Sequence, residues 1–117
     1  MKRIISATLA AALLLGIAGP VTAAPASITL DQAAPSFGDQ VTFTWSSNRA
    51  ESIQLQCSQS GFLVFADGQL VRNDPVFTLG PSLAWKGGAA DCTALLGHRA
   101  RSGRYMVEAT VEFGVGA

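Results

Sequence analysis

Regular alternation between apolar and polar residues is the feature that most restricts the fold of this chain. It is clearest between residues 105 and 113, where one face collects apolar side chains and the other face is mostly polar. Successive side chains of a β-strand point to opposite faces, so a period of two predicts a half-buried strand. The residues predicted to point inward are Tyr105, Val107, Ala109, Val111 and Phe113.

Similar runs occur about seven times after residue 24, separated by turn residues, and no stretch has a helical period. In the run 41–46, Val41, Phe43 and Trp45 are predicted to point inward. Ser60-Gly61 is a predicted turn, and Asp67-Gly68 is the strongest two-residue hairpin signal in the chain. The predicted strands cover residues 27–31, 41–46, 53–58, 62–66, 69–72, 76–79, 91–96 and 105–113. About seven short strands predict an all-β domain, an immunoglobulin-like sandwich of two antiparallel sheets.

The N-terminal segment has the pattern of a secretory signal peptide. Lys2 and Arg3 form a positive head, residues 4–17 are predominantly apolar, and small residues follow. This pattern predicts removal of residues 1–23, which leaves one domain at residues 24–117. The mature protein is therefore expected to be secreted, either extracellular or periplasmic.

Two alternatives accompany the signal peptide. Cleavage after Ala26 is the second choice, because Ala24 and Ala26 are also small residues at suitable spacing. A membrane anchor is the other alternative, but about 14 apolar residues are short of the ~20 that a span requires. No membrane span is expected in the mature form.

Cys57 and Cys92 are the two cysteines of the chain. In an exported domain one disulfide is the simplest interpretation, and redox activity is not expected without a Cys-x-x-Cys spacing. In immunoglobulin-like topology, Cys57 falls near the end of strand C and Cys92 near the start of strand F. Those strands are antiparallel neighbours, so the bridge is predicted to lie within one sheet. The bridge of antibody domains instead joins the two sheets across the core.

Composition limits the partners of the domain. The chain is 49% hydrophobic, too apolar for a disordered protein, and about 94 residues can bury one core. Without Lys2 and Arg3, six basic residues face eight acidic ones, so the mature domain carries about −2. A net negative domain is a poor general binder of nucleic acid, and no nucleic-acid partner is expected.

A segment in the second half of the chain resembles small immunoglobulin-like proteins exported by bacteria. The matching run is Phe77-Thr78-Leu79-Gly80 followed by Trp85-x-Gly87-Gly88-Ala89-x-Asp91-Cys92-x-Ala94-x-Leu96, about a third of the mature chain. Those proteins mostly lack an assigned activity, so the resemblance implies a fold and a bacterial origin and no particular function. Exported chromophore-carrying apoproteins of the neocarzinostatin type share the architecture but usually carry two disulfides, whereas this chain can form one.

The sequence offers little catalytic chemistry. His98 is the one histidine, and the chain has neither a Gly-x-Ser-x-Gly elbow nor a phosphate-binding glycine loop. The carboxylates are scattered, and Glu108 and Glu112 are predicted on a solvated face. Because acid-base catalysis needs groups held against one another, the chain is expected to be no enzyme and to need no cofactor or metal.

The predicted turn at residues 97–104 is the first candidate binding surface. It places His98, Arg99, Arg101 and Arg104 within eight residues. The planar fork of arginine suits carboxylate, sulfate and phosphate groups, and loops at one end of a sandwich are common binding sites. The alternative is a solvated hairpin connection without a partner.

The second candidate is the strand at residues 62–65, which is apolar on both faces. Phe62 and Val64 are predicted on one side and Leu63 and Phe65 on the other. An uncovered apolar face marks an interface. The preferred interpretation is intramolecular cover by the connection that contains Trp85, so a monomer is expected over a homodimer.

Trp85 is the third candidate. It is flanked by Lys86 and by glycines, and an exposed tryptophan on a β-sandwich stacks on sugar rings in carbohydrate-binding modules. The alternative is a tryptophan packed over the disulfide.

The expected function is that of a secreted, non-catalytic binding module whose partner is an extracellular protein or an anionic surface polymer. A small-molecule carrier or an inhibitor of a secreted hydrolase is the alternative on the same sandwich. An apolar pocket between the sheets would favour the carrier. A rigid protruding loop braced by the disulfide would favour the inhibitor.

Overall fold

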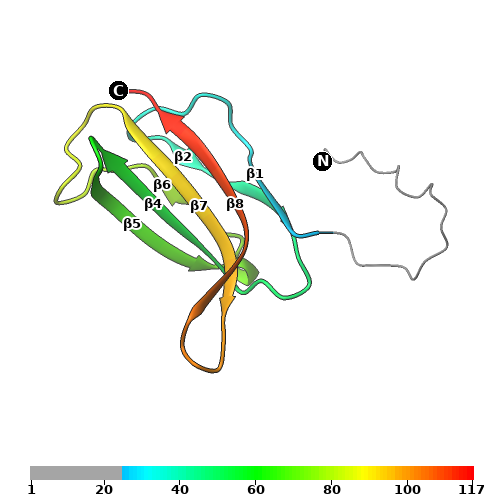
Figure 1. The fold of residues 1–117 in the computed structure, drawn as a ribbon. Coiled ribbons are helices and arrows are strands. Elements are labelled where there is room, and N and C mark those ends of the chain that lie inside the picture. The colour runs from blue at the N-terminus through cyan, green and yellow to red at the C-terminus, as the bar shows by residue number, and fades with distance from the viewer. Residues whose placement is uncertain (1–24) are drawn as a thin grey trace.

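Two layers of antiparallel strands face each other in the computed structural model, which describes residues 25–117 (Figure 1). The larger layer is a four-stranded sheet in the order β5-β4-β7-β8. Its strands are β4 (Ser52–Gln59), β5 (Phe62–Leu70), β7 (Ala90–Arg99) and β8 (Tyr105–Val115). The predicted signal peptide, residues 1–23, lies outside the described residues.

The facing layer consists of two short pairs. One pair joins β1 (Ser27–Leu30) to β3 (Phe43–Ser46), and the other joins β2 (Gln40–Val41) to β6 (Phe77–Thr78). A short 3-10 helix, η2 (Val71–Asn73), follows β5. The prediction of an all-β chain built from antiparallel sheets is confirmed. Within residues 25–117 no helix has the length and apolar character needed to cross a bilayer.

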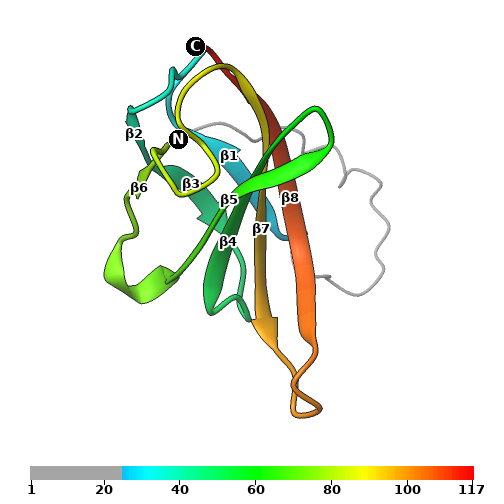
Figure 2. The ribbon, with the colours of Figure 1, turned by 90° about the vertical axis from the view of Figure 1, so that its left-hand side faces the viewer.

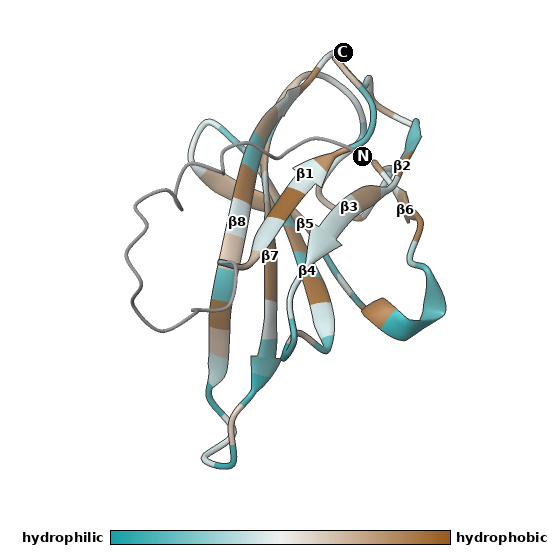
Figure 3. Ribbon diagram, turned by 90° about the vertical axis from the view of Figure 1, so that its right-hand side faces the viewer, coloured by the Kyte–Doolittle hydropathy of each residue, from teal (hydrophilic) through white to brown (hydrophobic). Residues whose placement is uncertain are grey.

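The core lies between the layers, and brown apolar bands occur on strands of both layers (Figure 3). Ile53, Leu55 and Cys57 are buried in β4, whereas the intervening Gln54 and Gln56 are more accessible, as the alternation predicts. The largest side chains that are fully buried in the described residues are those of Trp85, Phe77, Ile53, Leu55, Leu79 and Leu96. These side chains fill the space between the two layers.

The prediction of a hairpin turn at Asp67-Gly68 is wrong. β5 runs without interruption from Phe62 to Leu70, and the turn lies earlier, at Ser60-Gly61, where both residues have positive φ (51° and 83°). Gly68 instead makes room for a neighbour, because the Gln54 side chain of β4 occupies the space that a Cβ at Gly68 would need. A glycine within a strand often marks such a close approach.

The predicted face of β8 is correct only for its second half. A register shift between Leu96 and Gly97 leaves Glu108 without a partner on β7. Such a bulge reverses the inward and outward faces of β8 for the residues that precede Glu108. Val107 is consequently 50% exposed instead of buried. The ring of Tyr105 lies over Gly97 on the face turned away from the core, since a Cβ at Gly97 would sit 3.0 Å from Tyr105 Cε2.

Candidate functional site

The hairpin formed by β7 and β8 extends beyond the rest of the sandwich (Figure 2). Its turn is closed by two backbone hydrogen bonds, from Ala100 N to Arg104 O (2.8 Å) and from Gly103 N to Ala100 O (2.9 Å). The Arg99 guanidinium donates to the Gly103 carbonyl at 2.6 Å. Arg101 and Arg104 are exposed. The turn in the structure is therefore shorter than the predicted turn at residues 97–104, because β7 continues to Arg99.

Tyr105 ties the base of this hairpin to the sheet. Its hydroxyl lies 2.9 Å from the Ser52 carbonyl oxygen and 3.2 Å from the Leu95 carbonyl oxygen, and 3.1 Å from Ser52 Oγ. Burial raises the pKa of Tyr105 above its ordinary value, although the hydrogen bond with Ser52 opposes the rise. The tyrosine was predicted to be a core residue, and it is instead a half-buried clamp on the outer face.

Most of the positive charge in the described residues lies at the end of the sandwich that carries this hairpin, where hydrophilic residues gather (Figure 3). We call it the hairpin end: the loop 47–51, η2 with Asp74, and residues 98–108. It holds five of the six arginines and lysines of residues 25–117 and three of the eight carboxylates, a net +2. The remainder holds one basic and five acidic residues, a net −4. The basic residues of the hairpin end are Arg49, Arg72, Arg99, Arg101 and Arg104.

A polar cluster joins the hairpin to the loop between β3 and β4. His98 Nδ1 lies 2.5 Å from Glu108 Oε2, and the Ser47 hydroxyl donates to Glu108 Oε1, also at 2.5 Å. Arg49 Nη2 lies 3.4 Å from His98 Nε2. The Ser47 hydroxyl oxygen also accepts from the backbone N–H groups of Arg49 and Ala50, both at 3.0 Å. The cluster therefore fixes the loop against the hairpin.

The electrostatics of the cluster favour an ionised Glu108. The hydrogen bond from Ser47 holds the pKa of Glu108 below its ordinary value, and the contact with His98 lowers this pKa further. The order of contacts differs from that of a catalytic triad, in which the imidazole lies between the hydroxyl and the carboxylate. Here the carboxylate lies between the hydroxyl and the imidazole, so the imidazole does not contact Ser47. In this arrangement Ser47 and His98 hold the charged Glu108 carboxylate in a fixed position.

The Phe62 to Phe65 strand does not have the predicted faces. A register shift between Cys57 and Ser58 leaves Val64 as the extra residue, and Phe65 lies opposite Cys57 on the core side. Phe65 is partly buried against Trp85, with ring centroids 6.0 Å apart. Leu63, predicted on the same face as Phe65, is 60% exposed, and Phe62 is 75% exposed. The Trp85 connection thus covers Phe65 and leaves the tip of the β4–β5 hairpin open.

Replacing Phe65 with aspartate should lower the free energy of unfolding by about 2–3 kcal/mol, because a charge would be placed against buried Trp85. Phe62→Asp is the matched control and should change it by less than about 0.5 kcal/mol, since Phe62 is exposed. Urea denaturation followed by circular dichroism compares the two. Equal destabilisation by both substitutions would mean that the faces of β5 are assigned incorrectly.

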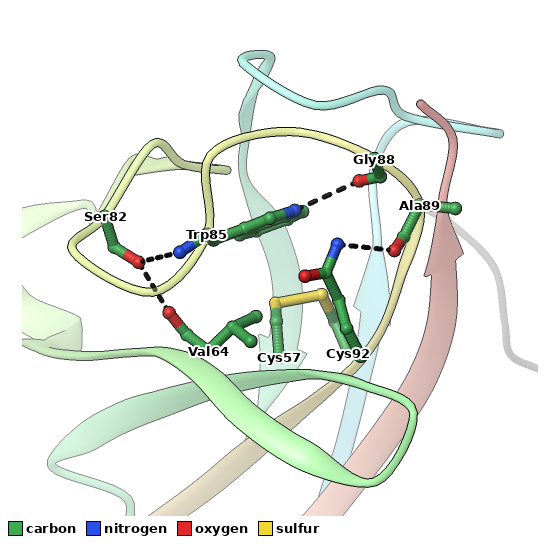
Figure 4. Close-up of a disulfide and its surroundings, with 8 residues drawn as sticks. Cys57, Val64, Ser82, Trp85, Gly88, Ala89 and Cys92 are labelled. Carbon is green, nitrogen blue, oxygen red and sulfur yellow. Dashed lines mark hydrogen bonds between the residues drawn. A yellow bond between two sulfur atoms is a disulfide. The ribbon is translucent and has the colours of Figure 1, made fainter.

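Trp85 packs over the disulfide that joins Cys57 to Cys92 (Figure 4). The two cysteines lie directly opposite each other on β4 and β7, within one sheet, as predicted. Trp85 has no exposed surface, and its indole N–H donates to the Gly88 carbonyl at 3.0 Å. The candidate role in sugar stacking is therefore contradicted, and the packing alternative is correct.

Hydrogen bonds hold the connection that carries Trp85. The Ser82 hydroxyl donates to the Val64 carbonyl at 2.5 Å and accepts from Trp85 N at 3.0 Å. Gln59 Nε2 bridges the carbonyls of Gly87 and Ala89, both at 2.9 Å. The connection is therefore fixed over the disulfide by hydrogen bonds to β4 and β5.

A shallow hollow of about 400 Å³ lies at the same end of the sandwich as the disulfide. It is open to solvent, and most of its lining is polar, with two carboxylates. Its lining residues are Ser58, Asp91, Cys92, Thr93, Glu112 and Phe113. A hollow of this character does not suit a small apolar ligand, which needs a concave apolar surface.

Sequence reasoning found the residues of the hairpin and missed their neighbours from other elements. Ser47, Arg49 and Arg72 lie far from His98 in the sequence and reach the hairpin end through the topology. The available signal was positional. The predicted immunoglobulin-like topology would place the loop after strand B (residues 41–46) and the loop after strand F (residues 91–96) at the same end.

The described residues contain no group of three or more histidine, cysteine or acidic side chains that could hold a metal ion. Comparisons of the chain with protein-family models, with curated proteins and with solved structures found no match.

Proposed function

We propose that this chain is the precursor of a secreted bacterial, immunoglobulin-like binding domain that captures an anionic partner through its hairpin end, without catalysis. The observation that carries the proposal is the concentration of five exposed arginines at the hairpin end of an otherwise acidic domain. The disulfide supports export, because such bridges persist in oxidising compartments.

The strand order supports the immunoglobulin-like assignment. The sheet β5-β4-β7-β8 corresponds to the order C′-C-F-G. In the facing layer, β1 takes the place of strand A, β2 and β3 together take the place of strand B, and β6 takes the place of strand E. Segment 35–37 adds a short parallel contact, a bridge between Ser36 and Gly116, next to the last strand. In this arrangement the β7–β8 hairpin is the F–G loop, which is a common binding loop of such domains.

An anionic surface polymer or an acidic extracellular protein fits the hairpin end by charge. Arg101 and Arg104 extend into solvent, so their guanidinium groups are free to pair with sulfate, phosphate or carboxylate groups. The carrier alternative gains little support, since large side chains fill the space between the layers. For the inhibitor alternative, the protruding hairpin lies at the opposite end from the disulfide, which therefore does not brace it.

The experiment measures binding of the mature domain to immobilised dextran sulfate and poly-glutamate, with neutral dextran as the background. Replacing Arg99, Arg101 and Arg104 with serine should weaken binding about 100-fold, because each basic side chain at an anionic surface contributes roughly 1 kcal/mol. Binding of the wild-type domain should also weaken as salt rises, since exposed charges are screened.

Two controls separate charge from fold. Replacing the same three arginines with lysine keeps the charge and should retain most of the binding to dextran sulfate, while a Lys86→Ser variant should bind like the wild type. The serine variant should keep its free energy of unfolding within about 0.5 kcal/mol per substitution. Unchanged binding by the folded serine variant would refute a role for the hairpin end.

A further inference from the structure

His98 lies between two charged side chains that come from different parts of the fold. Its Nδ1 atom contacts Glu108 on β8, and its Nε2 atom contacts Arg49 in the loop between β3 and β4. The guanidinium of arginine can only donate hydrogen bonds. Nε2 must therefore accept from Arg49, and Nδ1 must carry the proton and donate it to Glu108. These contacts require neutral His98.

Protonation of His98 changes the partner that it can hold. The protonated imidazole carries an N–H at both nitrogens, so Nε2 then faces Arg49 with a donor and a positive charge. The contact with Glu108 becomes an ion pair and strengthens, whereas the contact with Arg49 is lost. Arg49 also has an exposed side chain in the loop, so it can leave the imidazole for solvent.

The surroundings of His98 permit this change. The charged groups that contact it are Glu108 on one side, which also accepts from Ser47, and Arg49 on the other, and Met106 is its partner on β8. The next residue along β7 is Arg99, whose backbone N–H lies 3.4 Å from Glu51 Oε1. Because Ser47 keeps Glu108 ionised, the carboxylate can stabilise protonated His98 at mildly acidic pH.

We propose that this cluster is a pH switch on the hairpin end, in which protonation of His98 releases Arg49 and leaves the Arg49 guanidinium and the Nε2–H of His98 available to the anionic partner. The consequence for binding rests on the proposed function. The release of Arg49 does not.

The release is measured first, in the mature domain without any ligand. Nuclear magnetic resonance follows the His98 ring protons and the Arg49 Nη2–H signal from pH 7.5 to 5.5. The Arg49 signal should lose its distinct shift and slow exchange with the same midpoint as the His98 titration. In His98→Gln, which should remain folded by circular dichroism, the Arg49 signal should not depend on pH over this range. A wild-type Arg49 signal unchanged through the His98 titration would overturn the switch.

Binding to dextran sulfate is measured second. Sulfate esters stay ionised over this range, so a change in binding belongs to the protein. Wild-type binding should strengthen about 25-fold from pH 7.5 to 5.5, because protonation adds the charge of His98 and frees that of Arg49, each worth roughly fivefold. His98→Gln should lose this increase, and it also controls for titration of the chain's amino terminus. Arg49→Ala should retain about a fivefold increase from the charge of His98 alone.

The two readouts fail separately. Release of Arg49 without any dextran sulfate binding at either pH would refute the proposed function and leave the switch standing. Binding that strengthens equally in wild type and in His98→Gln would refute the coupling of the switch to the partner. Binding at both pH values, with an Arg49 signal that never changes, would refute the switch alone.

Discussion

Replacing Trp85 with alanine should lower the free energy of unfolding by about 3–5 kcal/mol, as expected for a large aromatic side chain removed from a packed core. Trp85 has no exposed surface and packs edge-on against Phe37 and Phe65, with centroid distances of 5.1 and 6.0 Å. The substitution also removes the donor to the Gly88 carbonyl. Small domains are stable by about 5–15 kcal/mol, so the loss is a large part of the whole.

The measurement is urea denaturation followed by far-ultraviolet circular dichroism, which does not depend on the missing fluorophore. Trp85→Phe is the matched control. It keeps an aromatic ring near Phe37 and Phe65, loses the indole hydrogen bond, and should cost about 1–2 kcal/mol. A loss below about 1 kcal/mol for Trp85→Ala would show that the connection 80–89 does not close the core.

Removing the disulfide should destabilise the domain by about 4 kcal/mol. The bridge closes a loop of 35 residues, and the chain-entropy estimate for this length gives that value. Cys57→Ala together with Cys92→Ala is the appropriate variant, since both positions are buried and alanine introduces no polar group. The measurement is the same denaturation experiment on the oxidised wild type and the double variant.

Each single variant, Cys57→Ala and Cys92→Ala, should match the double variant within about 1 kcal/mol when kept reduced, because either substitution abolishes the bridge. If the double variant were as stable as the oxidised wild type, the bridge would not stabilise the fold.

Sequence periodicity predicted the strands and failed where a strand gains an extra residue. In β4, Ile53 and Leu55 are buried as predicted, because that strand keeps its alternation up to Cys57. In β8 the extra Glu108 reverses the faces of Tyr105 and Val107. In β8 the bulge leaves no mark in the alternation, which stays regular from Tyr105 to Phe113.

Glycines gave the one local indication of these irregular points, and it was ambiguous. Gly97 lies at the β7–β8 register shift, and Gly68 lies where a side chain of the next strand crosses. Both also look like turn residues, which is how the sequence alone placed them. A glycine permits a turn and a close approach equally well, so only the pairing partner distinguishes the two.

The candidate site was predicted in part for a similar reason. His98, Arg99, Arg101 and Arg104 are adjacent in the sequence, and their grouping could be recognised from it. Arg49 joins them only because the chain returns to the same end of the sandwich after β3. Contacts between residues about 50 positions apart depend on register, which a single sequence does not specify.

The most direct measurement is a chemical-shift map of the isotope-labelled domain, residues 24–117, titrated with dextran sulfate at pH 6. The account predicts that the perturbed amides and side chains lie at the hairpin end, in residues 47–51, 71–74 and 98–108. It also predicts that the perturbations shrink as salt is raised. Perturbations centred on Phe62 and Leu63 or on the hollow beside the disulfide, or no perturbation at low salt, would contradict it.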